Sequence, residues 1–301
     1  MIVILGHTAA GKTAVAARVA NRLRGEVISA DSRQVYRGMD IGTGKDYDDY
    51  MVDGSRVPVH LIDIVDAGVE YNLFRFQQDF SQVCTSLMRS SRRPVLCGGS
   101  GLYIESVIKN YRLLMVPPNV VLRAELEGKT DEQLGLILKQ YGPLHNITDT
   151  VSRKRLIRAI EIAEYQSREP LESSPTLSLK PLVVGIAFDR ENRRRRITER
   201  LTARLEAGMI DEVRHLLESG VDHDKLRYYG LEYKYISMYL EGALNYEEMV
   251  ARLNTAIHRF AKRQMTYFRG MERRGIEIRW LRGALPPEEK VSRIVSWFSI
   301  I

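Results

Sequence analysis

The chain contains little cysteine and no long apolar run. Only Cys84 and Cys97 occur among its 301 residues, too few for a disulfide framework or a zinc cluster. We therefore predict a reducing compartment, the cytoplasm, with both thiols in the core and no zinc. No apolar stretch approaches the thickness of a bilayer, and the apolar start Met1–Leu5 is too short for a signal-peptide core. These absences argue against a secreted disulfide-rich protein and predict no membrane partner.

The charge balance favours a polyanionic partner without naming one. Lys and Arg number 45 against 38 Asp and Glu, which makes a formal net charge of +7. Such a surplus is typical of nucleic-acid-binding proteins, but many basic proteins bind no nucleic acid. With 44% apolar residues, the chain has room for one large domain or for one domain with an insert.

Short runs rich in Val and Ile alternate with helical patterns. The runs predict strands over Ile2–Leu5, Glu26–Ala30, Val59–Ile64, Pro94–Cys97, Pro181–Phe188 and Ile276–Leu281. The helical patterns cover Thr13–Arg24, Leu73–Ser90, Tyr103–Asn110, Asn192–Ser219 and Tyr246–Arg269. Apolar strands separated by helices predict an α/β fold with a parallel sheet covered on both faces.

One stretch differs in character from the rest. Residues 117–179 are charged and helical by pattern, without a convincing strand, and Pro117-Pro118 and Glu172–Pro175 bound them. We predict a helical insertion domain here, within a core formed by residues 1–116 and 180–301.

A phosphate-binding loop follows the first predicted strand. It reads Gly6-His7-Thr8-Ala9-Ala10-Gly11-Lys12-Thr13, a match to G-x-x-x-x-G-K-[ST] between a strand and a helix. Its glycines let backbone N–H groups turn around phosphate oxygens, and the helix N-terminus adds a positive dipole end. Lys12 is expected at the terminal phosphates and the Thr13 hydroxyl on Mg²⁺. The loop predicts a P-loop NTPase-like core that binds a diphosphate, and kinases, ATPases and transferases all remain possible.

The segment after the second predicted strand carries further polar groups. Asp31 stands at the C-terminal end of that strand, where ligands of parallel sheets bind. Its carboxylate suits a general base or a magnesium ligand, and capping of a helix by Asp31 and Ser32 is an equally good interpretation. Gln34 and Tyr36 offer an amide and a ring, which suit the edge and face of a nucleobase.

With these motifs, the chain resembles the tRNA dimethylallyltransferases (tRNA isopentenyltransferases), in their bacterial form without a zinc finger. The resemblance spans nearly the whole chain. Besides the phosphate loop, it rests on five segments, Asp31–Thr43, Val57–Ile64, Gly98–Tyr103, Arg155–Glu161 and Ala261–Arg269.

The resemblance implies transfer of a dimethylallyl group from dimethylallyl diphosphate to N6 of an adenosine. This adenosine lies 3′-adjacent to the anticodon (position 37) in tRNAs reading codons that start with U. It further implies that Asp31 is the general base, with Ser100 and Arg227 as further catalytic residues. Ser100 replaces the family's usual Thr, and His7 replaces a common Pro of the loop at a position whose side chain the motif leaves free.

The resemblance also assigns RNA contacts and partners. The implied tRNA-binding residues are Asp31, Ser32, Arg33, Gln34, Ser100, Arg123, Lys154, Arg155, Leu156, Ile157 and Arg158. Charge alone favours a solvated helix face for 153–158, and the run Arg193–Arg196 is expected to be partly solvating as well. The partners are the tRNA anticodon stem-loop and dimethylallyl diphosphate with Mg²⁺, and we expect a monomer.

Three alternatives stay open. The first is an adenylate isopentenyltransferase that modifies free AMP, ADP or ATP. The second is a small-molecule kinase that shares the loop and the sheet and would carry lid arginines around a γ-phosphate. The third is a nucleotide-gated RNA-binding protein without transfer activity, in which Asp31 would be dispensable.

Overall fold

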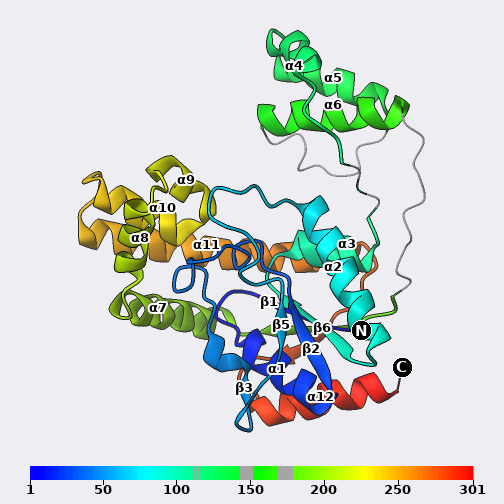
Figure 1. The fold of residues 1–301 in the computed structure, drawn as a ribbon, viewed down its shortest axis with the longest axis vertical. Coiled ribbons are helices and arrows are strands. Elements are labelled where there is room, and N and C mark those ends of the chain that lie inside the picture. Colours follow the sequence, from blue (N-terminus) through cyan, green and yellow to red (C-terminus); the bar gives the residue numbers. More distant parts are fainter. Residues whose placement is uncertain (112, 114, 143–151, 169–178, 301) are drawn as a thin grey trace. The chain divides into compact units, whose positions relative to one another are not determined.

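A computed structural model of the chain describes residues 1–111, 113, 115–142, 152–168 and 179–300. The chain folds as two compact units, one formed by Met1–Asn110 with Ser178–Ile301 and the other by Tyr111–Leu177 (Figure 1). Residues 143–151 and 169–178 of the predicted insert lie outside the described residues. None of the helices in the described segments combines the length and the apolar character needed to cross a bilayer.

The larger unit is built on a six-stranded sheet in the order β5-β2-β6-β1-β7-β8, with all neighbours parallel. The strands are β1 (Ile2–Gly6), β2 (Gly25–Ser29), β5 (Val59–His60), β6 (Arg93–Gly98), β7 (Leu182–Ala187) and β8 (Arg279–Arg282). A separate antiparallel hairpin consists of β3 (Met51–Val52) and β4 (Ser55–Arg56). The predicted P-loop NTPase-like parallel sheet is confirmed.

Helices cover both faces of the sheet. The helices of this unit are α1 (Lys12–Arg22), α2 (Leu73–Arg89), α3 (Gly101–Ile108), α7 (Arg190–Glu206), α8 (Met209–Glu218), α9 (His223–Tyr229), α10 (Leu231–Leu240), α11 (Tyr246–Arg273) and α12 (Pro287–Ser299), with a 3₁₀ turn at Tyr47–Tyr50. Helices α1 and α12 pack together on one face, and α2, α3 and α11 cover the other. This two-sided cover explains why the strands are apolar throughout.

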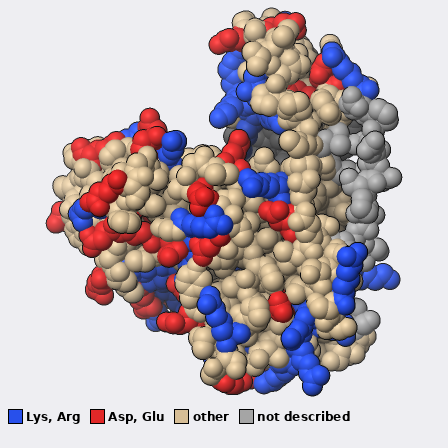
Figure 2. Space-filling model, viewed as in Figure 1, with Lys and Arg blue, Asp and Glu red and all other residues tan. Residues whose placement is uncertain are grey.

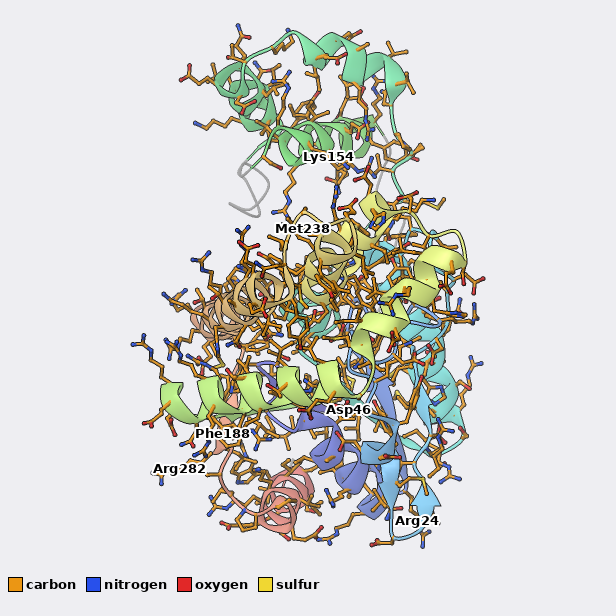
Figure 3. The ribbon with its side chains drawn as sticks, turned by 90° about the vertical axis from the view of Figure 1, so that its left-hand side faces the viewer. Arg24, Asp46, Lys154, Phe188, Met238 and Arg282 are labelled. Carbon is orange, nitrogen blue, oxygen red and sulfur yellow. The ribbon has the colours of Figure 1, made fainter. Side chains whose placement is uncertain are left out.

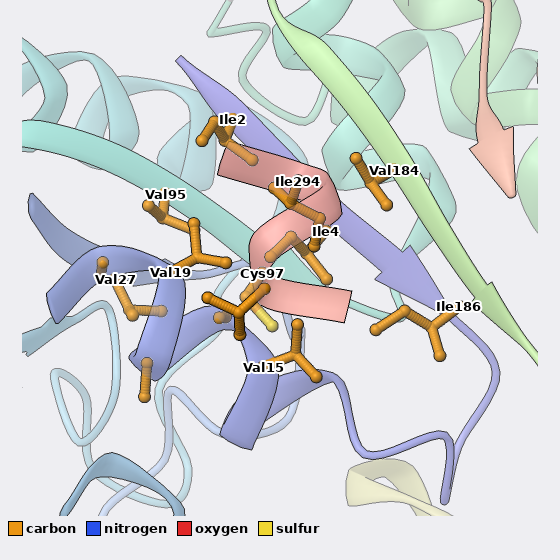
Figure 4. Close-up of a cluster of buried hydrophobic side chains, with 14 of the residues drawn as sticks. Ile2, Ile4, Val15, Val19, Val27, Val95, Cys97, Val184, Ile186 and Ile294 are labelled. Carbon is orange, nitrogen blue, oxygen red and sulfur yellow. The ribbon is translucent and has the colours of Figure 1, made fainter. Parts of the chain in front are cut away.

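The main core lies between the sheet and the α1–α12 face (Figure 4). Ile4 of β1 and Val184 of β7 are fully buried there against Val19 of α1 and Ile294 of α12. Each fully buried aliphatic side chain of this kind contributes about 1.5–3 kcal/mol. This core holds the end of β1 and the start of α1 in place, and the phosphate loop connects them.

Three predicted elements differ from the structure. The strand predicted over Val59–Ile64 ends at His60, because Leu61 and Asp63 adopt left-handed backbone conformations with φ of 61° and 55°. The strand predicted over Ile276–Leu281 begins only at Arg279. The single helix predicted over Asn192–Ser219 is two helices, since Gly208 has φ of 93° and begins α8 in a left-handed conformation.

The smaller unit contains three helices among its described residues, α4 (Val120–Glu127), α5 (Asp131–Gln140) and α6 (Arg153–Arg168). Asn119 caps α4 by accepting the Leu122 N–H, and Thr130 caps α5 in a reciprocal capping box with Gln133. A small apolar core of Leu126, Leu134, Leu138, Leu156 and Ile160 joins the three helices. The unit therefore has a core of its own.

Candidate active site

The phosphate loop lies between β1 and α1, the strand–loop–helix context that its motif requires. A Cβ at Gly6 would lie 2.4 Å from the backbone oxygen of Ile186 in β7, so only glycine fits there. Gly11 begins α1 with φ of 72°, a left-handed conformation that glycine adopts without strain. The Lys12 ammonium donates to the His7 carbonyl at 2.9 Å, and its burial lowers the pKa of Lys12. Proximity of an anionic ligand would favour the charged ammonium.

His7 is not free, contrary to the expectation for this loop position. Its side chain is fully buried. The Phe188 N–H after β7 donates to His7 Nε2 at 3.3 Å, so the proton of the neutral ring is on Nδ1, which donates to the Thr8 carbonyl at 2.7 Å. Burial lowers the pKa of His7 to about 4. The neutral ring therefore links the phosphate loop to the exit of β7.

Asp31 and Ser100 come together from two neighbouring strand ends. The Asp31 side chain accepts the Arg33 N–H at 2.9 Å through Oδ1 and caps a turn rather than a helix. Asp31 Oδ2 accepts no hydrogen bond from the residues that the structure describes. Ser100 Oγ accepts the Ser32 N–H at 3.1 Å. The turn thus holds the Asp31 carboxylate at the C-terminal end of β2 and leaves one carboxylate oxygen available for a ligand.

The two groups expected to read a nucleobase are engaged within the protein. Gln34 Oε1 accepts from the Ser29 hydroxyl at 3.1 Å, and Gln34 Nε2 donates to the Gly44 carbonyl at 2.9 Å. Tyr36 is only 1% exposed and packs against Tyr229, with ring centroids 4.7 Å apart. The interpretation of Tyr36 as a ring offered to a base is therefore wrong, because that ring belongs to the core.

Gln264 of α11 joins the two loops of the site, a contact that no sequence pattern had indicated. Its Oε1 accepts the Thr8 N–H at 2.9 Å, and its Nε2 donates to the Gly99 carbonyl at 3.0 Å. The side chain is 7% exposed. One amide group thereby connects the phosphate loop to the turn that carries Ser100. The segment Ala261–Arg269, quoted for the resemblance, contained this residue without revealing its contacts.

Helix α7 presents arginines to the phosphate loop. Of these, Arg196 belongs to the run Arg193–Arg196 that was expected to be partly solvating, whereas no pattern had pointed to Arg200 or Arg204. Arg196 Nε donates to the Ala9 carbonyl at 3.0 Å, and Arg200 donates to the Thr8 hydroxyl at 3.3 Å. Arg204 lies one turn further along. The spacing i, i+4, i+8 puts the three guanidinium groups on one side of the helix and could have identified this basic face from the sequence.

A carboxylate holds two of these arginines beside the loop. Asp46 Oδ2 accepts from Arg200 at 2.7 Å, and its Oδ1 accepts from Arg204 at 3.4 Å. Asp46 is labelled at one end of α7 in Figure 3. Gly44 has φ of 73°, a left-handed conformation that favours glycine, and the Arg204 guanidinium occupies the space where a Cβ would lie. Burial lowers the pKa of Arg204 and raises the pKa of the nearby Glu232 carboxyl.

Arg227 lies near the end of α9, and its guanidinium has acidic partners. It donates to Asp224 at 2.8 Å and to Glu241 at 2.5 Å. The side chain is 40% exposed and lines the same cavity as the phosphate loop. Arg227 would have to share or exchange these partners to contact a diphosphate.

One large cavity joins these groups. Its volume is about 1300 Å³, and all of its lining residues belong to the larger unit. The lining includes Lys12, Thr13, Asp31, Ser100, Arg200 and Tyr267. Cationic and hydroxyl groups at the phosphate loop, a carboxylate at the strand end and several aromatic rings thus face one space. It can hold a phosphorylated molecule together with a second reactant.

The donor set fits a hard divalent cation that a diphosphate also ligates. Thr13, Asp31 and Asp49 contribute hydroxyl and carboxylate oxygens to the cavity wall, and Mg²⁺ is usually bound by one or two carboxylates plus phosphate oxygens. Among the described residues no group of three His, Cys, Asp or Glu is arranged to hold a metal by itself. A protein-only metal cage is therefore not present in this part of the chain.

In the smaller unit, two of the predicted tRNA-binding arginines are bound to a buried carboxylate. Glu161 is 1% exposed and accepts from Arg123 at 2.7 and 2.8 Å and from Arg158 at 3.1 Å. Desolvation would raise the pKa of Glu161, but these hydrogen bonds outweigh it and lower that pKa to about 2. Arg158 also donates to the Val116 carbonyl at 2.6 Å. Both arginines therefore hold the unit together.

The remaining predicted tRNA-binding residues of α6 divide by exposure. Lys154, labelled in Figure 3, and Arg155 are exposed and have no ion pair with any described residue. Leu156 is 3% exposed within the apolar core, and Ile157 packs against that core. Figure 2 shows Lys and Arg side chains at several places on the visible face of this unit, with Asp and Glu side chains among them. Of the predicted tRNA-binding residues on α6, Lys154 and Arg155 are therefore the exposed basic ones without an ion pair among the described residues.

The comparison with known proteins is consistent with this site. The profile of the IPP transferase family matches residues 34–271. The chain belongs to the IPP transferase family. It is 55% identical over 299 residues to tRNA dimethylallyltransferase 1 of Porphyromonas gingivalis, covering 99% of each chain. It is 54% identical over 292 residues to tRNA dimethylallyltransferase 2 of Bacteroides fragilis, covering 97% of this chain and 95% of that one.

The fold agrees as well. The crystal structure of the full-length tRNA isopentenylpyrophosphate transferase of Bacillus halodurans superimposes with a TM-score of 0.71 at 31% identity, covering 99% of this chain and 95% of that chain. The resemblance to tRNA dimethylallyltransferases of bacterial type is thereby confirmed at the level of the family.

Proposed function

We propose that this IPP transferase family member transfers a dimethylallyl group from dimethylallyl diphosphate to N6 of a tRNA adenosine. The acceptor is the adenosine at position 37, 3′-adjacent to the anticodon, in tRNAs reading codons that start with U. The observation that carries the proposal is the single cavity in which a phosphate loop with Lys12 and Arg200 faces the carboxylate of Asp31. A diphosphate leaving group and a base for the incoming amine are the two requirements of this reaction.

The departing diphosphate would be stabilised by the phosphate loop. In the reaction the allylic C–O bond breaks, and the diphosphate leaves with both electrons. Backbone N–H groups at the start of α1, the Lys12 ammonium and the Arg200 guanidinium supply positive charge where the negative charge grows. Asp46 holds Arg200 beside Thr8 before the ligand binds, so little reorganisation is needed during the reaction.

The proton of the amine would go to Asp31. As N6 of adenine forms the C–N bond to the allylic carbon, one of its protons must leave, and the open Oδ2 of Asp31 can accept it. Ser100 would orient the acceptor nucleotide from the neighbouring strand end, and Arg227 would approach the diphosphate from α9. General-base catalysis of this kind contributes about 10²–10⁴-fold in rate.

We also propose that the bound diphosphate carries Mg²⁺. Thr13, with Asp31 or Asp49, supplies suitable oxygen ligands at the cavity wall. When bound, the cation would neutralise the negative charge that develops on the diphosphate oxygens as the C–O bond breaks.

For the tRNA, we propose contacts at Ser32, Arg33 and Gln34 beside the cavity and at Lys154 and Arg155 on the smaller unit. Basic side chains without acidic partners gain most from phosphate contacts, because they displace no internal ion pair. We also propose that the protein acts as a monomer, since Lys12, Asp31 and Arg200 of the one chain line the same cavity. The proposal includes a cytoplasmic location, where tRNA is used.

The test incubates the protein and Mg²⁺ with dimethylallyl diphosphate and an anticodon stem-loop that carries three consecutive adenosines, and then weighs the RNA. We expect a gain of one dimethylallyl mass on the 3′-most of these adenosines. Parallel reactions contain free AMP in place of RNA, or ATP in place of the donor. Modification of AMP but not of RNA would identify an adenylate isopentenyltransferase. Phosphoryl transfer or ATP consumption without RNA modification would identify a kinase.

A further inference from the structure

Tyr228 presents an open aromatic ring to the active-site cavity. It precedes the last residue of α9, lines the cavity and is 57% exposed. No other Phe, Trp or Tyr side chain in the described ranges is as exposed. Exposure of a large ring inside a cavity that also contains Asp31 and Ser100 calls for a ligand.

Arg33 covers part of this ring. Its guanidinium carbon lies 4.9 Å from the centroid of the Tyr228 ring, a cation–π distance. Arg33 has no ion pair with a carboxylate among the residues that the structure describes. Its backbone N–H is bonded to Asp31, so its side chain extends from the Asp31 turn to the Tyr228 ring. The Arg33 side chain therefore links the Tyr228 ring to the turn that carries the Asp31 carboxylate.

The ring also rests on a rigid base. Tyr229 packs edge-on against Tyr228 with centroids 5.8 Å apart, and Tyr229 in turn packs on the buried Tyr36 at 4.7 Å. The Tyr229 hydroxyl accepts the backbone N–H of Gly68. Since Tyr229 and Tyr36 are 3% and 1% exposed, Tyr228 projects from a packed aromatic cluster and would lose little freedom when a ligand binds.

We propose that Tyr228 and Arg33 form a stacking platform for the nucleobase next to the acceptor adenosine, an inference that rests on the proposed function. An adenine whose N6 reacts at Asp31 must leave its stack, and its neighbours then lose a partner. An aromatic ring and a guanidinium plane are the groups on which proteins stack such splayed bases. Because every base has a π-face, the platform tolerates different neighbours. The Arg33 charge is available for the adjoining phosphate.

The first variant pair separates the ring from its hydroxyl. Tyr228→Ala is expected to weaken binding of an anticodon stem-loop by about 5- to 150-fold, the usual range for loss of one base–aromatic stack. Tyr228→Phe keeps the ring and is expected to bind within about 2-fold of the wild type. Tyr246→Ala serves as a matched control, because Tyr246 is 44% exposed on α11 and does not line the cavity. A thermal melt of each variant checks that the fold is retained.

The second measurement locates the base. Stem-loops carry 2-aminopurine on the 5′ or the 3′ side of the acceptor adenosine and are titrated with protein in the absence of the prenyl donor. We expect quenching at one of these two positions with the wild type and with Tyr228→Phe, and its loss with Tyr228→Ala. A signal that does not depend on the Tyr228 ring, or an equal loss of affinity in the Phe and Ala variants, would overturn the proposal.

These outcomes are distinguishable from failure of the proposed function. If the wild type transfers the prenyl group and Tyr228→Ala keeps the wild-type KM for RNA, the platform is wrong and the function stands. If ring-dependent quenching occurs but the wild type transfers nothing, the platform stands and the function is wrong.

Discussion

Removing the Gln264 side chain should disturb both loops of the active site at once. In Gln264→Ala the Thr8 N–H and the Gly99 carbonyl lose their partners, which lie at 2.9 and 3.0 Å. A buried polar group without a partner costs about 1–3 kcal/mol. Both groups line the cavity, but Gly99 is buried, whereas Thr8 is partly exposed and water can reach it. Two unpaired groups would together cost about 2–6 kcal/mol. Because water can reach one of them, we expect the free energy of unfolding to fall by about 2–3 kcal/mol.

The same change should impair catalysis through the phosphate loop. Without the Thr8 bond, the loop N–H groups are no longer held against the Gly98–Ser100 turn. We expect a higher KM for dimethylallyl diphosphate and a kcat lowered by about 10-fold or more, since small displacements of catalytic groups are costly. In Gln264→Glu, a carboxylate can still accept the Thr8 N–H but repels the Gly99 carbonyl. This variant should therefore be at least as impaired as Gln264→Ala.

Urea unfolding and steady-state kinetics test this reasoning together. Gln82→Ala is the matched control, because Gln82 is an exposed glutamine of α2 that does not line the cavity. The control is expected within about 0.5 kcal/mol of the wild type. If Gln264→Ala has the stability and the KM of the control, the amide bridge between the two loops contributes nothing and the reasoning fails.

Three further predictions concern the carboxylates and the basic face. Asp31→Asn keeps an oxygen to accept the Arg33 N–H but cannot take a proton, so single-turnover transfer should fall about 100-fold or more with RNA binding unchanged; a near-wild-type rate would contradict this. Charge reversal at Lys154 and Arg155 should weaken tRNA binding and lower its dependence on salt, and an unchanged salt slope would return this face to plain solvation. Glu161 has its pKa lowered from 4.5 to about 2, so its contribution to stability is complete above pH 4.5 and is lost as the pH falls toward 2. At 1.36 kcal/mol per pKa unit the shift amounts to at most about 3 kcal/mol, reduced because the arginine partners are half-exposed. Acid unfolding of Glu161→Gln should lack this part of the pH dependence, and identical pH profiles of wild type and variant would refute it.

Local patterns predicted most of the architecture correctly. The apolar strands, the loop Gly6–Thr13 and the start of α1 follow from short-range rules, because each depends on residues adjacent in the chain. Boundaries failed where single residues adopt left-handed backbone conformations, as at Leu61 and Asp63 after β5. Gly208 divided a continuous helical pattern in the same way. Such conformations depend on contacts that a periodicity does not contain.

The predicted site residues also divide into those that depend on local sequence and those that depend on tertiary contacts. Asp31 could be assigned to the ligand-binding end of the sheet from its position after a strand, because parallel strands present their carboxyl ends to ligands. The role of Tyr36 was misjudged, since its burial against Tyr229 joins residues far apart in the chain. The sequence did not show that Arg123 and Arg158 share one partner. In the fold, both form ion pairs with the buried Glu161 carboxylate.

A parallel α/β core with a phosphate-loop motif could be predicted from the order of the residues alone, and the motifs indicated the family. The reason is that a phosphate loop is a local device, in which a strand, a glycine turn and a helix N-terminus follow one another along the chain. Only the tertiary structure decided how His7, Arg200 and Gln264 support that loop. Their partners lie 181, 192 and 256 positions away in the chain, and contacts over such separations arise only when the sheet, α7 and α11 have packed together.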